Sequence, residues 1–159
     1  MAKSTLNNRI KANRGKAFSL IELLIVVAII GAFTSIGFPA YMEYAKRIKI
    51  STAISDILEL EPKIARFYSR GASYPNSLAD LGPVPIDPWG NAYRYLNLAT
   101  VKGKGKARKD KSLVPINSDY DLYSMGEDGR SVSPLTAKHS HDDIVRGSNG
   151  GFVGLATDY

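Results

Sequence analysis

Cysteine is absent from the 159-residue chain, and only two residues are histidine. Without thiols, the fold has no disulfide, no zinc–thiolate centre and no cysteine nucleophile. Both histidines, His139 and His141, lie in one short segment. A nucleophile elsewhere in the chain therefore has no histidine of its own segment to act as its base. We therefore expect a protein that is not an enzyme, with both histidines exposed to solvent rather than bound to a transition metal.

Acidic residues are missing from the first 17 positions, which carry five cations. This leader accounts for most of the formal charge of +6, because the chain from Phe18 onward has sixteen Lys and Arg against fifteen Asp and Glu. A general affinity for nucleic acid is therefore not indicated. A second basic segment, Lys102–Lys111, has six cations and one acid but no aromatic residue for base stacking. We expect a solvated loop and no specific nucleic acid partner, with contact to anionic lipid or a partner protein as the alternative.

Charge of either sign is also absent from Leu23–Met42, a run of twenty mostly apolar residues. A helix of that length measures about 30 Å, the thickness of the hydrocarbon core of a bilayer. A basic leader ahead of such a run predicts a membrane protein with a cytoplasmic N-terminus. The alternative is an ordinary signal peptide, whose apolar core is usually about 7–15 residues long and ends at a small-residue cleavage site. No convincing site of that kind closes this run before Lys46, so we expect the apolar segment to remain in the mature protein.

The residues around position 18 resemble a known processing motif. The segment Lys16–Glu22 is similar to the prepilin motif of type IV pilins and type II secretion pseudopilins, with Ala17 where glycine is usual. This resemblance implies that a prepilin peptidase cuts between Ala17 and Phe18 and methylates the new N-terminus at Phe18. Pro39, the twenty-second residue counted from Phe18, also stands where the family has a proline. In the family, this part of the helix can melt when subunits pack into a filament.

Glu22 places a carboxylate at the front of the apolar run, where an unpaired charge is costly. Cleavage would create a cationic amine at Phe18, four residues away in the same chain, and a similar amine on each neighbouring subunit. Two charges about 4 Å apart attract more strongly in a low-dielectric setting than in water, although desolvation offsets much of the gain. We expect Glu22 to pair with such an amine, and the resemblance implies that it sets subunit registration during assembly. The alternative is a glutamate that reaches the membrane surface without a partner.

The rest of the pattern predicts an α+β fold. Apolar residues recur at three- and four-residue spacing after Tyr44, so the helix that begins near residue 18 should run to about residue 70. The expected apolar face consists of Ile50, Ile54, Ile57, Leu58, Ile64 and Tyr68. Strands are expected over Ala92–Leu98 and about Tyr120–Met125, with Trp89 as a core anchor. The expected architecture is a long N-terminal α-helix, membrane-spanning in its first half, packed on a small C-terminal antiparallel β-sheet. The expected divisions are a cleaved leader (1–17), an assembly helix (18–42), its amphipathic continuation (43–70) and a periplasmic globular domain (71–159).

Acidic residues gather at both ends of a loop near the C-terminus. Taken separately, Asp128 begins a turn, while Asp142 and Asp143 are surface charges. Taken together, the three carboxylates can converge with main-chain carbonyls, and hard oxygen ligands of this kind suit Ca²⁺. The segments 87–91 and 121–129 resemble the major pseudopilin of type II secretion systems, which binds one calcium ion in the loop between its last strands. The resemblance implies side-chain ligands at Asp128, Asp142 and Asp143, and main-chain ligands at Met125 and Ser140.

These observations predict a structural function. By resemblance, the chain is a subunit of a type II secretion pseudopilus, a homo-oligomeric filament assembled from the inner membrane into the periplasm during protein export. The implied partners are prepilin peptidase, minor pseudopilins, an inner-membrane assembly platform and the membrane itself. The alternative is a type IV pilin subunit for adhesion, motility or DNA uptake. Many such pilins close their terminal loop with a disulfide, which this chain cannot form.

Overall fold

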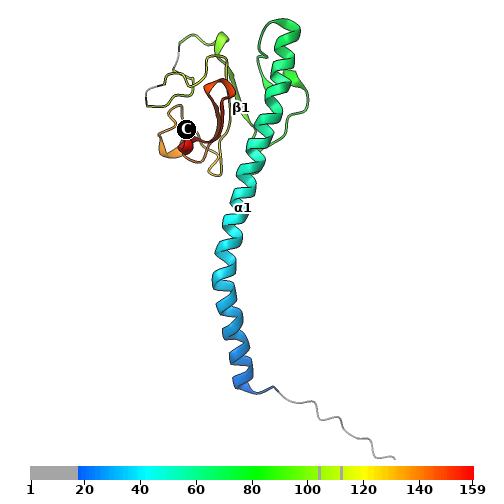
Figure 1. Ribbon diagram of the computed structural model, residues 1–159, viewed down its shortest axis with the longest axis vertical. Coiled ribbons are helices and arrows are strands. Elements are labelled where there is room, and N and C mark those ends of the chain that lie inside the picture. Colours follow the sequence, from blue (N-terminus) through cyan, green and yellow to red (C-terminus); the bar gives the residue numbers. More distant parts are fainter. Residues whose placement is uncertain (1–17, 104, 112) are drawn as a thin grey trace, which may run out of the picture. The chain divides into compact units, whose positions relative to one another are not determined.

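The structure, a computed structural model, describes residues 18–103, 105–111 and 113–159 (Figure 1). The chain divides into two compact units, one ending at Met42 and the other formed by Glu43–Tyr159. One long helix, α1 (Leu20–Gly71), contributes to both units. The second unit also contains the strands β1 (Arg94–Asn97), β2 (Tyr120–Ser124), β3 (Ile144–Gly147) and β4 (Phe152–Leu155).

In the first unit, every residue from Phe18 to Met42 is exposed. Large apolar side chains are included, with Phe33 75% exposed and Phe38 67% exposed. Helix α1 continues without a break across Pro39. Within the described part of the chain, α1 is the one helix that is long and apolar enough to cross a membrane.

The four strands form one antiparallel sheet in the order β1-β2-β3-β4. Tyr95 on β1 lies opposite Leu122 on β2, and Val145 on β3 lies between Tyr123 on β2 and Gly154 on β4. The predicted α+β fold is confirmed, as are the first two strands, both of which are shorter than expected. Strands β3 and β4 were not predicted, because both contain a glycine, a residue that is depleted in strands.

Helix α1 buries a narrow apolar stripe against this sheet. The stripe consists of Ala53, Ile57, Leu60 and Ile64, all 0% exposed. Its spacing of four, three and four residues places these side chains on one helical face. The predicted face was too wide, because Leu58 is 50% exposed and Tyr68 is 43% exposed. Trp89 is partly buried and packs against the same core.

A buried arginine fastens the helix to the sheet. The Arg146 guanidinium, on β3, donates from Nε to Glu61 Oε1 on α1 at 2.5 Å. It also donates from Nη1 and Nη2 to the two carboxylate oxygens of Asp119, both at 2.8 Å. Its charged carbon lies 4.0 Å from the centre of the Tyr120 ring. Burial lowers the pKa of Arg146, but the hydrogen bonds to Asp119 and Glu61 outweigh this effect and leave the pKa raised, so the guanidinium stays charged.

A second link between helix and sheet is made by a tyrosine. The Tyr93 hydroxyl donates to Asp56 Oδ2 at 2.7 Å. Burial, together with this hydrogen bond to a carboxylate, raises the pKa of Tyr93, so its hydroxyl remains a donor.

Beyond β2 the chain turns sharply at Gly126, where φ is +63°. A Cβ atom at this position would lie 2.2 Å from the main-chain oxygen of Asp142. Glycine therefore allows both the positive φ and the close approach of this turn to residue 142. The contact brings together two segments that are fourteen or more residues apart in the chain.

We expect Gly126→Ala to destabilise the globular unit through two costs that can be separated. The positive φ costs about 1–2 kcal/mol, and displacing the backbone at Asp142 costs about 1–3 kcal/mol more. Gly103→Ala has a positive φ in open space and should show only the first cost, while Gly105→Ala meets no atom within 4 Å. The measurement is urea unfolding of the full chain in detergent, followed by the fluorescence of the single tryptophan. If Gly126→Ala were no more destabilising than Gly103→Ala, the close approach would be wrong.

Candidate functional sites

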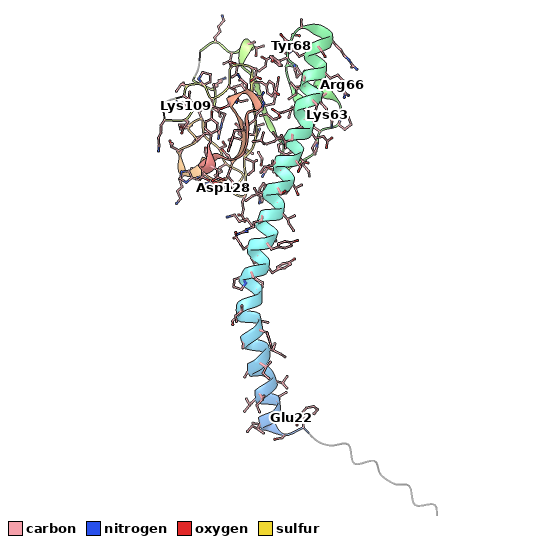
Figure 2. The ribbon with its side chains drawn as sticks, in the orientation of Figure 1. Glu22, Lys63, Arg66, Tyr68, Lys109 and Asp128 are labelled. Carbon is pink, nitrogen blue, oxygen red and sulfur yellow. The ribbon has the colours of Figure 1, made fainter. Side chains whose placement is uncertain are left out.

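The predicted processing and assembly residues lie at the start of α1. Phe18 is 77% exposed, and Glu22 lies in the first turn of the helix (Figure 2). A helix N-terminus favours a nearby carboxylate, since its free N–H groups carry partial positive charge. Among the described residues, the Glu22 side chain has no hydrogen-bond or ion-pair partner. The predicted cleavage residue Ala17 lies outside the described residues.

Helix α1 continues from Glu22 as an apolar surface that no other described residue covers. All of its residues up to Met42 are exposed, including six isoleucine or valine side chains between positions 21 and 30. Soluble monomers rarely expose a contiguous apolar surface of this size. The surface is therefore suited to contact lipid chains or the helices of other subunits.

At the opposite end of the chain, the structure brings Asp128 and Asp142 together. The main-chain N–H of Asp128 donates to Asp142 Oδ2 at 2.9 Å. The Asp128 carboxylate accepts from the N–H of Arg130 at 2.7 Å and lies 3.2 Å from His139 Nδ1. The hydrogen bond from Arg130, and then the one from His139, lower the pKa of Asp128, which keeps the carboxylate ionised. Both His139 and His141 are exposed, as predicted.

Asp143 faces a different environment from that of its neighbour Asp142. It is fully buried and forms an ion pair with Arg108, and Ser131 donates to its Oδ2 at 2.6 Å. Burial raises the pKa of Asp143, while Ser131 and Arg108 act in the opposite direction. The other carboxylate oxygen, Oδ1, is buried and has no hydrogen-bond partner in the part of the chain that the structure describes.

Arg108 is the residue that sequence reasoning missed. Its side chain is 3% exposed, donates to the carbonyl of Val132 at 2.6 Å and lies 4.4 Å from the centre of the Tyr123 ring. Its main-chain N–H donates to Asp121 Oδ2 at 2.7 Å. The basic segment is thus not a fully solvated loop, although its described lysines at 102, 106 and 111 are exposed. The available signal was Ala107, which is the one residue of that segment that is neither charged nor glycine.

The terminal loop contains oxygen donors of the type that calcium prefers. The Asp142 carboxylate accepts from the main-chain N–H of Asp128, and Asp143 has a buried oxygen with no partner among the described residues. In residues 18–103, 105–111 and 113–159, however, no three His, Cys, Asp or Glu side chains converge closely enough to hold a metal ion. Main-chain carbonyls would therefore have to complete such a site. The Met125 carbonyl precedes the turn at Gly126, and that of Ser140 accepts from the N–H of Asp143 at 3.3 Å.

Comparison with known proteins agrees with the motif at residue 18. A family model described as the prokaryotic N-terminal methylation motif matches residues 12–38. Type II secretion system core protein G of Pseudomonas aeruginosa is 27% identical over 135 residues, which cover 71% of this chain and 84% of that protein.

Two relatives named as pilins are also similar along most of their length. A type IV major fimbrial protein FimA of Dichelobacter nodosus is 33% identical, covering 87% of this chain and 85% of that protein. A type IV major pilin protein PilE1 of Neisseria gonorrhoeae is 33% identical, covering 80% of this chain and 96% of that protein. No solved structure gives a significant match. The exposed apolar helix, the methylation motif and these similarities establish that the chain belongs to the type IV pilin-like family, which includes type IV pilins and type II secretion pseudopilins.

Proposed function

We propose that this chain is a structural subunit of a type II secretion pseudopilus. It is stored as a single-pass inner-membrane protein with a cytoplasmic N-terminus and a periplasmic globular unit, and it is drawn from the membrane into a filament that drives protein export. The observation that carries the proposal is the exposed apolar segment from Phe18 to Met42, most of which lies within the matched methylation motif. A chain with this apolar surface requires lipid or copies of itself to cover it.

The residues at the start of α1 take defined roles in this proposal. Prepilin peptidase cuts between Ala17 and Phe18 and methylates the Phe18 amine. Glu22, which has no partner among the described residues of its own chain, accepts the cationic amine of a neighbouring subunit. The pair sets the register between helices, because an unpaired carboxylate in the membrane is costly. Pro39 lacks the N–H that would bond the carbonyl of Ser35, so it weakens the helix where subunits pack.

The choice of a pseudopilus over a surface pilus depends on the terminal loop. Asp128 and Asp142 meet there, and the chain has no cysteine with which to close the loop. The proposed partners are accordingly those of a secretion system, namely minor pseudopilins and an inner-membrane assembly platform. The second candidate is a type IV pilin for adhesion, motility or DNA uptake, and the similarity to FimA and PilE1 favours it.

A strain lacking this gene separates the two candidates. The first predicts loss of exoprotein release with normal twitching, and restoration of release by the parent chain. Glu22→Ala should fail to restore release although the protein is made and cleaved, because it removes the proposed partner of the amine. Glu43→Ala is the matched control, since Glu43 forms only an exposed ion pair with Arg47. Loss of twitching with normal exoprotein release would instead show that the chain is a type IV pilin subunit.

We further propose that the terminal loop binds calcium. Asp128 and Asp142 would hold the ion together with the main-chain carbonyls of Met125 and Ser140. Asp143 would contribute its unpartnered oxygen while sharing the other with Arg108. When bound, the ion would neutralise these carboxylates and fasten the two ends of the loop together.

The calcium proposal is tested by the stability of the full chain in detergent. An ion that binds only the folded state adds about 2.7 kcal/mol at one hundred times its Kd, so calcium should raise the melting temperature of the parent. Asp128→Asn should abolish this rise with little change in chelator, whereas Asp110→Asn, outside the loop, should retain it. Equal melting of the parent in calcium and in chelator would remove the calcium claim without touching the filament proposal.

A further inference from the structure

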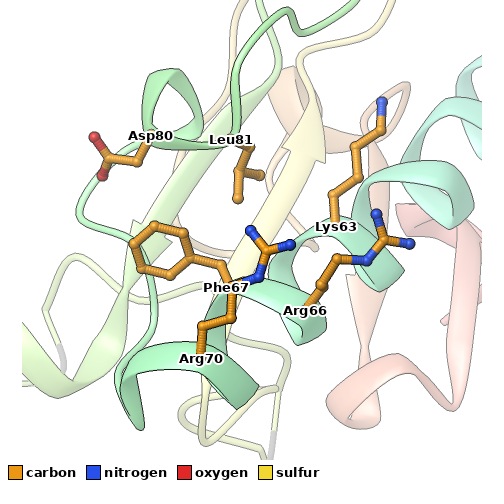
Figure 3. A pocket seen from close by; sticks show the side chains of 6 residues that line it. All are labelled: Lys63, Arg66, Phe67, Arg70, Asp80 and Leu81. Atoms are coloured by element: carbon orange, nitrogen blue, oxygen red, sulfur yellow. The ribbon is translucent and has the colours of Figure 1, made fainter.

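A small basic hollow lies on the globular unit near the end of α1 (Figure 3). It has a volume of about 150 Å³, enough for the end of one side chain. The hollow is lined by Lys63, Arg66, Phe67 and Arg70 from one face of the helix, and by Asp80 and Leu81 from the short helical turn after it. Three of the six lining residues are therefore cationic.

Two of the four charged side chains that line the hollow already have partners within the chain. Lys63 donates to Glu59 Oε1 at 2.8 Å. Asp80 accepts from the main-chain N–H groups of Asn76 and Ser77 at 2.9 and 3.0 Å, which caps its own helical turn. Asp80 is thus held by backbone donors rather than by an arginine across the hollow.

Arg66 and Arg70 have no such partners. Among the described residues, neither guanidinium forms a hydrogen bond or an ion pair. The two arginines are four residues apart on one helix, and like charges at this spacing destabilise a helix by a few tenths of a kcal/mol. Arg70 lies in the last turn, where the helix dipole favours a cation, but this effect does not extend to Arg66. The pair is suited to a carboxylate supplied from outside the chain, because arginines bind carboxylates through paired N–H donors.

The same chain carries an unused carboxylate in an exposed turn. Glu127 is exposed and has no side-chain partner among the described residues. Its turn is anchored to the rest of the unit by Asn91, whose Nδ2 donates to the Gly126 carbonyl at 3.5 Å. Two residues beyond Asn91, Tyr93 bonds to Asp56 on α1. The turn of Glu127 therefore lies near the level of Asp56 along the helix.

This position separates Glu127 from the basic hollow within one chain. Arg66 and Arg70 are ten and fourteen residues beyond Asp56, or about 15 and 21 Å along the helix axis. Figure 2 shows Asp128, beside Glu127 in sequence, and Arg66 toward opposite ends of the globular unit. The acid and the two arginines cannot meet inside one subunit, but they can meet when copies stack in the same direction. Such a head-to-tail contact repeats along an open filament.

We propose that Glu127 of one copy binds Arg66 and Arg70 of the next copy along the filament. The occupant of the basic hollow is thus a second copy of this chain, recognised by charge. The inference rests on the proposed function, since it requires subunits stacked in one direction. It adds a contact between globular units, separate from the packing of the apolar helices.

The absence of native cysteine allows a direct cross-linking test in cells that make the filament. The full chain carries Glu127→Cys and Arg70→Cys and is treated with a bis-maleimide whose arm is shorter than the separation of the two sites within one chain. The expected result is a ladder of covalent dimers and larger species in sheared filaments. A matched control with Asp158→Cys and Arg70→Cys should give no ladder, because Asp158 lies outside the Glu127 turn.

Charge reversal gives a second readout that does not depend on the cross-linker. Arg66→Glu with Arg70→Glu should lose filaments, as should Glu127→Arg alone, while the three changes together should restore them. Asp158→Lys should leave filament yield unchanged. Filaments and export without a ladder, or with no effect of reversal, would overturn this contact and leave the proposed function standing. Absence of filaments and of export defects in every strain would overturn both, and capture of a different acidic protein by Arg66 and Arg70 would overturn the choice of occupant.

Discussion

The buried guanidinium of Arg146 holds the second half of α1 on the sheet. It reaches Glu61 on the helix and Asp119 beside β2, and it lies over the Tyr120 ring. Removing one partner from a buried ion pair commonly costs about 3–5 kcal/mol, because the remaining charge stays in a medium of low dielectric. The apolar stripe centred on Ile57 supplies contact area, but contact area alone does not fix register. Arg146 fixes it, since its donors satisfy acids on two separate segments at once.

Helix α1 buries its apolar stripe in one unit and exposes its apolar residues in the other. In the unit from Glu43 onward, the helix covers its apolar stripe with a sheet of the same chain. In the unit that ends at Met42, the helix exposes an apolar surface that suits contact with lipid or with other subunits. The buried Arg108–Asp143 pair fastens the basic segment to the terminal loop within the unit from Glu43 onward.

The helix and the acidic turn could be predicted from sequence, while the burial of particular charges could not. A long periodic pattern predicts α1, and the segment 16–22 predicts its processing, because both signals are local. The adjacent acids Asp142 and Asp143 look alike in sequence, yet one meets Asp128 and the other lies beneath Arg108. That difference depends on packing between segments that are fourteen and thirty-five residues apart. Strands β3 and β4 escaped prediction for a related reason, since each contains a glycine and is specified mainly by its neighbours in the sheet.

A double-mutant cycle between Glu61 and Arg146 tests most directly whether this ion pair holds the helix to the sheet. Glu61→Gln, Arg146→Met and the double variant are compared with the parent by urea unfolding of the full chain in detergent, followed by the fluorescence of the single tryptophan. The account predicts a coupling free energy between about 0.5 and 3 kcal/mol, with the double variant less destabilised than the sum of the single variants. Effects that add to within about 0.3 kcal/mol would show that this ion pair does not hold the helix to the sheet, contrary to the account.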